Sequence, residues 1–394
     1  MENASLTNRS LCIDALRGLA LFGILAVNIQ SFVWGLSGPT LGVLNADSTS
    51  SDYATVFFTA LLLEYKAYPI FCFCFGYGFA MQTQRWLSTG ENAASRFAGR
   101  LRVMFLLGAA HGIFLYFGDI LSRYALTGFI LRRHIGKNSR ALWQAVKFWL
   151  VVAMVSALLS AFLVALASTA ESEPNQLATQ QIQLQELDRF FTIYTTGSFW
   201  EITLRRWQDY LQITLGFIFT LPQIMLLFLL GVLTARMKWL QYPEKHQTRW
   251  KKILLIATLI GVPLNIFYAL GAVEQAQTPT ATPSFAHMVA SSAIPILAGA
   301  YIALVAIFST STIGKRTLTF FASAGKIALT NYITQSIVMS TLLYGYGFAL
   351  GGELTQFQLL EIAMLIYGAQ LTVSHIYLKH FSIGPLEFLW RKLS

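Results

Sequence analysis

Apolar runs of about 20 residues recur along the whole 394-residue chain, and they restrict its fold more than any other feature. A helix of that length matches the hydrocarbon thickness of a bilayer. Charged residues make up only 12% of the chain, whereas soluble domains contain about 25%. The short alternating segments of an outer-membrane barrel are absent. The sequence therefore predicts an all-α polytopic membrane protein, with one integral membrane domain over residues 1–394.

The Lys and Arg residues lie in short clusters between the apolar runs, and these clusters set the predicted topology. Cytoplasmic loops of membrane proteins carry an excess of such residues. Placing every cluster on one side gives about ten transmembrane helices, with the N- and C-termini both cytoplasmic. The same pattern explains the net charge of +10 without a nucleic-acid partner; the partner it indicates is the lipid bilayer. The expected spans are 16–36, 53–81, the hairpin 103–131, 142–167, 213–233, 253–273, 284–308, 328–350 and 357–378.

Three smaller expectations complete this topology. Residues 168–200 are acidic and Gln-rich and are expected to form an extracytoplasmic polar insert. Residues 379–394 are expected to form a cytoplasmic C-terminal segment. Residues 53–65 fit either an interfacial helix or part of a span.

The chain contains no zinc or nucleotide-binding motif, and its three cysteines cannot build a zinc site. We expect no metal.

The hairpin 103–131 has polar groups set into an apolar stretch, namely His111, Asp119 and Arg123. From Val103 to Leu131 there are 29 residues, whereas two full spans need about 40. The hairpin could be re-entrant, could consist of two tilted helices in a thinned membrane, or could continue past its flanking arginines. In the first two cases Asp119 and Arg123 lie at membrane depth.

The spacing of these three residues limits their contacts. On one helix, His111 and Asp119 would be separated by about 12 Å along the axis, so they would share a broad face without touching. Asp119 and Arg123 are spaced i, i+4 and could pair. Polar groups at membrane depth are candidates for a functional site. The structural alternative is a network in which Arg123 neutralises Asp119.

Other polar residues near the predicted spans suggest a ligand site as well. Asp14 and Arg17 are spaced i, i+3 at the inner end of the first span, where they form either an anchoring ion pair or a contact for an anionic ligand. Asn28 lies mid-membrane on nearly the same face and either joins helices or lines the site. Lys66 follows Glu64 and either extends to the outer interface or reaches inward.

The segment GKIALTNYITQS adds a polar stripe within a later span. It contains Asn331, Tyr332, Gln335 and Ser336, and Asn331 and Gln335 are spaced i, i+4. Such a stripe either holds neighbouring helices together or lines a site.

Four motifs, in order, resemble the YeiB family of bacterial inner-membrane proteins. They are RSLCIDALRGLALFGILAVNIQSF, KAYPIFCFCFGYGFAMQTQR, GRLRVMFLLGAAHGIFLYFGDILSRYALTGF, and GKIALTNYITQS together with GPLEFLWR. The resemblance covers nearly the whole chain. It implies a multi-pass protein of the bacterial inner (plasma) membrane.

The RGLALFGILAVN segment is more distantly similar to transmembrane acyltransferases such as heparan-alpha-glucosaminide N-acetyltransferase. This similarity implies transfer of an acyl group from a cytoplasmic acyl-CoA to a small-molecule, glycan or lipid acceptor at or beyond the membrane. His111 would then be the catalytic base and Asp119 its orienting partner or an acceptor contact. The remaining expected roles are CoA phosphate binding by Arg17, Arg100 and Arg102, and hydrogen-bond donation to the thioester by Asn28 or Tyr332.

Two other functions remain open on the same residues. A proton-coupled transporter of a small molecule would use the polar groups as a pathway. The scarcity of carboxylates in the spans and the lack of a visible internal repeat count against it, and the many glycines in the spans favour it. A non-catalytic membrane assembly factor is the third possibility.

Overall fold

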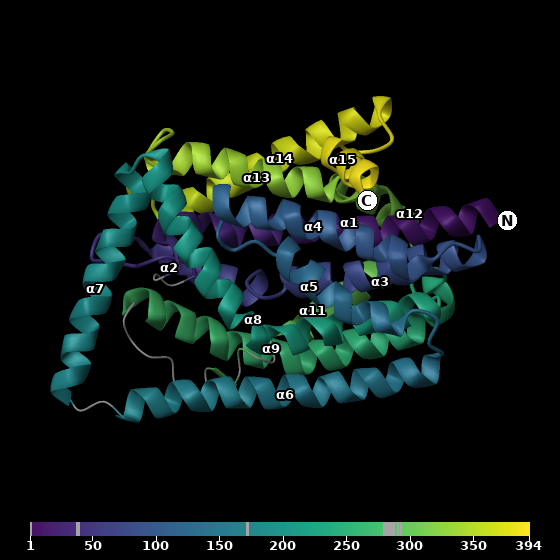
Figure 1. Cartoon of the computed structure of the whole chain (residues 1–394), viewed down its shortest axis with the longest axis horizontal. Coiled ribbons are helices and arrows are strands. Elements are labelled where there is room, and N and C mark those ends of the chain that lie inside the picture. Colours follow the sequence, from purple (N-terminus) through teal and green to yellow (C-terminus); the bar gives the residue numbers. More distant parts are fainter. Residues whose placement is uncertain (1, 37–39, 171–172, 279–287, 290, 292–293) are drawn as a thin grey trace.

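The computed structural model describes residues 2–36, 40–170, 173–278, 288–289, 291 and 294–394 (Figure 1). The regular secondary structure of these residues is helical, with no strand among them. The predicted all-α fold is therefore confirmed. The helices are α1 (Glu2–Trp34), α2 (Ser50–Leu62), α3 (Ala67–Ser88), α4 (Ala93–Phe114), α5 (Leu121–Leu131), α6 (Ser139–Ala170), α7 (Glu173–Thr196), α8 (Phe199–Arg236), α9 (Gln247–Gln277), α11 (Pro295–Phe308), α12 (Thr312–Lys326), α13 (Ala328–Leu343), α14 (Gln356–His380) and α15 (Pro385–Leu393).

Within the described residues, seven helical segments are long and apolar enough to cross a membrane. A shorter apolar helix, α11, lies where the run 284–308 predicts a span, although part of that run falls outside the described residues. The seven segments are Leu11–Trp34, Ser50–Ser88, Ala93–Phe114, Ser139–Leu166, Phe199–Arg236, Pro243–Gln277 and Gln356–His380.

The outer surface of the bundle carries large apolar side chains, as expected for a surface that contacts lipid. Helix α6 runs along one side of the molecule (Figure 1). In its most apolar stretch of 18 residues, only 6% is buried within the protein. Phe148, Val151 and Phe162 on this helix are more than half exposed. Such a continuous apolar surface is unfavourable in water and favourable in a bilayer.

The interior of the bundle is built around α1, which packs against α3, α12, α13 and α14. The α4–α5 hairpin packs against α8 and, through α4, against α15. The N- and C-termini lie at the same end of the molecule, near α12 and α15, whereas α7 lies at the opposite end (Figure 1).

The two arms of the hairpin 103–131 differ, and the first has the form given by the third alternative, a helix that extends past the flanking arginines. Helix α4 begins at Ala93 and continues past the flanking arginines. Helix α5 has only 11 residues, which corresponds to about 16 Å and is too short to cross a bilayer of about 30 Å by itself. A short helix is tolerated at membrane depth because neighbouring helices cover it.

Two other segments are more helical than the sequence suggests. The polar insert 168–200 contains α7, although residues 171–172 lie outside the described part of the chain. Residues 312–326, which contain a Lys–Arg pair and lie between the predicted spans 284–308 and 328–350, form α12. Its Lys315 and Arg316 are exposed, whereas Leu318 and Ala322 are buried against the bundle.

Candidate functional site

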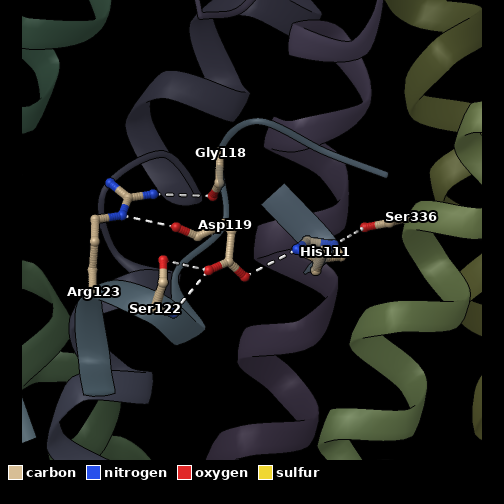
Figure 2. Close-up of polar contacts among 6 residues, drawn as sticks. All are labelled: His111, Gly118, Asp119, Ser122, Arg123 and Ser336. Atoms are coloured by element: carbon tan, nitrogen blue, oxygen red, sulfur yellow. Dashed lines mark hydrogen bonds and ion pairs between the residues drawn. The ribbon is translucent and has the colours of Figure 1, made fainter. Parts of the chain in front are cut away.

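His111 and Asp119 are in direct contact, which corrects the expectation that they do not touch. Helix α4 ends at Phe114, and the chain reverses direction before α5 begins at Leu121. This turn brings Oδ1 of Asp119 to 3.0 Å from Nδ1 of His111 (Figure 2). The expected separation holds only for a single continuous helix. Because α4 ends at Phe114, His111 and Asp119 do not lie on one helix.

The turn that holds Asp119 is itself well supported. Oδ2 of Asp119 accepts hydrogen bonds from the backbone N–H and the hydroxyl of Ser122, at 2.8 and 2.7 Å. Arg123 donates to the main-chain oxygens of Asp119 and Gly118, at 2.8 and 3.0 Å (Figure 2). The guanidinium group of Arg123 therefore stabilises the backbone of the turn. The carboxylate of Asp119 bonds to Ser122 and His111 instead of to Arg123.

Gly108 provides the space that this contact needs. A methyl group at this position would lie 2.7 Å from Oδ2 of Asp119 and still closer to the backbone nitrogen of Ser122. Any larger side chain would therefore push the turn away from α4. Gly108 is one helical turn before His111, so it allows the approach directly beside the imidazole ring.

Ser336 completes a chain of three hydrogen-bonded side chains. Its Oγ lies 2.8 Å from Nε2 of His111, on the opposite side of the ring from Asp119 (Figure 2). With Asp119 as a carboxylate acceptor, Nδ1 carries the hydrogen, and Nε2 accepts from the hydroxyl of Ser336. His111, Asp119 and Ser336 are 2%, 1% and 1% exposed. A serine, a base and an orienting carboxylate in this order resemble a nucleophile–base–carboxylate triad.

A cavity of about 260 Å³ lies between α1, α3, α4, α5, α12, α13 and α15. One end carries cationic side chains, of which Lys326 and Arg391 are exposed and Arg17 and Arg100 are partly buried. The rest of the lining is mostly apolar and aromatic. It extends no further than Leu107 on α4 and Tyr332 on α13, and we call this limit the closed end of the cavity because Tyr332 is only 5% exposed.

The cavity is directed at the His111–Ser336 pair. On α4 it is lined by Arg100, Met104 and Leu107, and the next position on that helical face is His111. On α13 it is lined by Tyr332, and the residue one turn further on the same face is Ser336. Tyr332 also contacts the histidine, because the centroid of its ring lies 4.8 Å from that of His111. The triad therefore lies about one helical turn beyond the closed end.

The comparisons with known proteins agree with the resemblance seen in the sequence. Residues 234–394 match the family described as "Protein of unknown function (DUF418)". The chain is 27% identical to the uncharacterized protein YxaH of Bacillus subtilis (strain 168), over 98% of this chain and 94% of that protein. It is 26% identical to the uncharacterized protein YeiB of Escherichia coli (strain K12), over 98% of this chain and 96% of that protein.

The chain resembles YeiB over nearly its full length. The family match at 234–394 spans α13, which carries Tyr332 and Ser336, and the similarity to YeiB extends over 98% of the chain. No solved structure matches this chain.

The cationic end of the cavity brings together two of the expected phosphate ligands. Arg17 pairs with Asp14 at 3.1 Å and donates to the main-chain oxygen of Cys74. The guanidinium group of Arg100 lies 4.3 Å from the centre of the Trp390 ring. Both side chains are therefore held in place while still bordering the cavity. The third expected ligand, Arg102, is exposed on α4 and is not among the described residues that line the cavity.

The expected residues Asn28, Asn331 and Gln335 are not among the described residues that line the cavity. Asn28 is half-buried on α1. Asn331 donates to Ser374 at 3.0 Å and to the main-chain oxygen of Ala324, and Gln335 donates to Gln370 at 2.8 Å. Since Ser374 and Gln370 belong to α14, this part of the polar stripe joins α13 to α14.

Lys66 lies in a different part of the molecule. It is 1% exposed, so it reaches inward rather than to the membrane surface. Its ammonium group donates to the main-chain oxygen of Ala60 and lies 5.7 Å from the centre of the Tyr268 ring. Glu64, also buried, lies two residues before it. The described residues contain no group of three or more His, Cys, Asp or Glu side chains that could hold a metal ion.

The sequence alone did not assign a role to Ser336. It appears in the polar stripe of residues 331–336, but the stripe does not indicate which member meets the histidine. Its partner His111 is 225 residues away in the chain. The only available signal is its i, i+4 spacing from Tyr332, which places both on one face of α13.

Proposed function

We propose that this protein is a membrane-embedded acyltransferase, which moves an acyl group from a cytoplasmic acyl-CoA to an acceptor at or beyond the membrane. One observation carries the proposal. A cavity with cationic side chains at its exposed end leads toward a buried His111–Asp119 pair, about one helical turn beyond its closed end. A phosphate-bearing donor with a long, narrow arm and a reactive group at its tip fits this arrangement.

The cationic end suits the phosphates of CoA. Arg17, Arg100, Lys326 and Arg391 supply four positive charges there, and arginine binds phosphate through paired hydrogen bonds. The acidic Glu387 at this end is already occupied, because it accepts hydrogen bonds from the first turn of α13. The cavity is slightly smaller than the usual range of about 300–1,000 Å³ for ligand pockets. The nucleotide would therefore remain at the mouth, with only the arm inside.

The buried end suits general-base chemistry. Imidazole is the side chain that most often serves as a general base, and Asp119 fixes the ring so that Nε2 can accept a proton. The hydroxyl of Tyr332 is buried and donates no hydrogen bond to a described residue. Rotation of this side chain would open the path to His111, and its hydroxyl would donate to the oxygen of the thioester.

The proposal includes a topology of about ten spans in the bacterial inner membrane, with both termini in the cytoplasm. The clusters of Lys and Arg support this orientation. So does the position of both chain ends beside α12 and α15 (Figure 1), because α15 borders the cationic end of the cavity. Under this topology the acyl-CoA enters from the cytoplasm, and the acceptor approaches from the opposite end.

A proton-coupled transporter is the alternative function, and the buried Glu64 and Lys66 favour it. They are 2% and 1% exposed and lie outside the cavity. Ionisable groups buried in a membrane domain often mark a proton pathway. A transporter would acidify or alkalinise the interior of proteoliposomes upon substrate addition, and an acyltransferase would release thiol instead.

The proposal is tested by acyl-CoA binding to the purified protein in detergent. We expect acetyl-, octanoyl- or palmitoyl-CoA to raise the Tm of the wild type and to be bound about 10-fold more weakly by Arg100→Ala, since one charge-assisted hydrogen bond contributes about 1.5 kcal/mol. His111→Ala should still bind the donor but release no CoA thiol. Arg96→Ala is the matched control, because Arg96 lies one turn earlier on α4 and pairs with Glu91 at the surface. Failure of all three esters to bind would exclude the acyltransferase.

A further inference from the structure

We propose that Ser336 is the nucleophile of the reaction and carries the acyl group as an ester between donor and acceptor. This inference rests on the proposed acyltransferase function and specifies its mechanism as two successive transfers. The observation behind it is the unbroken chain from Ser336 Oγ through both ring nitrogens of His111 to Asp119, at 2.8 and 3.0 Å (Figure 2).

The hydrogen bond of Ser336 is unusual for a serine in a membrane helix. Such serines normally donate to a carbonyl three or four residues earlier in their own helix. Ser340, one turn further along α13, does so by donating to Ile337 at 3.0 Å. Ser336 instead points out of its helix to Nε2 of His111. Its hydroxyl is thus placed where a base can remove its proton.

The geometry favours the serine over the histidine as the acyl carrier. Both nitrogens of His111 are occupied, Nδ1 by Asp119 and Nε2 by Ser336. An acyl group on Nε2 would displace Ser336 and leave the buried hydroxyl without its partner. An acyl group on Ser336 instead leaves Nε2 free to serve the next proton transfer. Ser336 also lies on the face of α13 that continues from Tyr332, at the end of the cavity.

The first transfer is balanced in atoms and protons. The hydroxyl proton of Ser336 moves to Nε2 of His111 while Oγ forms a bond to the carbonyl carbon of the thioester. The C–S bond then breaks, and the leaving sulfur takes the proton from Nε2. The products are the Ser336 ester and free CoA thiol. Asp119 accepts from Nδ1–H throughout and stabilises the cationic ring between the two steps.

In the second transfer, the acyl group moves from Ser336 to the acceptor. The acceptor hydroxyl or amine gives its proton to Nε2 and attacks the ester carbon. The C–Oγ bond breaks, and Oγ takes the proton back, which regenerates Ser336. Because the first transfer does not need the acceptor, the wild type should release thiol in a burst before any acceptor is added.

The experiment measures donor binding, burst release of thiol and covalent labelling on the same samples. The probes are acetyl-, octanoyl- and palmitoyl-CoA added to purified wild type without acceptor. We expect binding, a burst of about one thiol per protein chain, and a matching mass increase on the α13 peptide that contains Ser336. Ser336→Ala should bind the ester normally and lose the burst by at least about 100-fold. The matched control is Ser340→Ala, which removes a buried hydroxyl from the same helix and should keep the burst.

The variant Ser336→Cys distinguishes a residue that carries the acyl group from one that only positions His111. A cysteine at this position should receive the acyl group as a thioester, which hydroxylamine cleaves at neutral pH far faster than it cleaves the wild-type ester. A residue that only positions His111 would not change the lability of the bond. This variant also covers the case in which Ser336→Ala fails to fold.

The outcomes distinguish the two proposals. If an ester binds but the wild type shows neither burst nor label on Ser336, transfer is direct, so the Ser336 inference is wrong and the acyltransferase survives. A label on His111 would overturn the inference in the same way. If none of the three esters binds, both proposals fall together.

Discussion

At the scale of single residues, the site depends on a missing side chain as much as on those present. Gly108 leaves room for the carboxylate of Asp119, which Ser122 then holds and His111 meets. Arg123 supports this contact through the backbone of the turn. The chemistry of His111 is therefore set by how closely the α4–α5 turn can approach α4.

We expect Gly108→Ala to separate Asp119 from His111. The added methyl group would lie 2.7 Å from Oδ2 of Asp119, and overpacking of this kind costs about 1–3 kcal/mol. Thiol release should fall by at least about 100-fold, while acyl-CoA binding should change little because Gly108 does not line the cavity.

The matched control for this change is Gly99→Ala on the same helix. Its added methyl group would meet its nearest neighbour at 3.5 Å, an ordinary van der Waals distance. We expect its rate of thiol release to match the wild type and its Tm to equal or exceed that of the wild type, because alanine is the better helix former. Equal loss of activity in both variants would mean that α4 responds to any added side chain, and the argument about Asp119 would fail.

At the scale of elements, close helix approaches hold the cavity walls together. Helix α8 contacts α3 where Gly231 meets the backbone of Phe73 and Tyr77. Small residues at such crossings let two backbones come together, which is the main source of helix association in membranes. Since α3 supplies Phe71, Phe75 and Phe79 to the cavity, this crossing also supports the site.

We expect Gly231→Ala to lower the Tm of the purified protein. Its methyl group would lie 2.8 Å from the backbone nitrogen of Tyr77 and would overlap the carbonyl oxygen of Phe73, at a cost of about 1–3 kcal/mol. Gly216→Ala is the control on the same helix, because it is exposed and has no neighbour within 4 Å. Alanine is the better helix former, so Gly216→Ala should leave the Tm unchanged or raise it. The reverse order of the two Tm values would contradict this view of the crossing.

At the scale of the whole molecule, the cationic end of the cavity lies toward one end of the helix bundle. This end lies near α15 and the chain termini, and α7 lies at the far end of the bundle (Figure 1). The proposed topology assigns the first end to the cytoplasm. The donor and acceptor of the proposed reaction would then approach His111 from opposite sides of the membrane.

This orientation predicts opposite labelling of two engineered cysteines. A membrane-impermeant maleimide should react with Gln181→Cys, in α7, in intact cells, and with Ser394→Cys, at the C-terminus, only after lysis. Background labelling of the native cysteines should be low because Cys12, Cys72 and Cys74 are buried. Labelling of both positions in intact cells would show that the two ends are not separated by the membrane as proposed.

Much of the fold could be predicted because it follows from local properties of the chain. Long apolar runs identify most of the membrane helices, since backbone groups in lipid must bond within their own helix. The prediction was less successful where helices are amphipathic or short. Helix α12 is not among the predicted spans, and its Lys315 and Arg316 lie on its exposed face.

The sequence by itself determined the membrane class of this protein and identified His111 and Asp119 as candidate site residues, because ionisable groups are costly in lipid and stand out in an apolar run. Only the tertiary structure decided which groups meet. The end of α4 at Phe114 brings Asp119 back to His111, and the packing of α13 beside the hairpin brings Ser336 to the other ring nitrogen. The physical reason is that helix periodicity fixes the face on which a side chain lies, whereas turns and helix packing fix its distant partners.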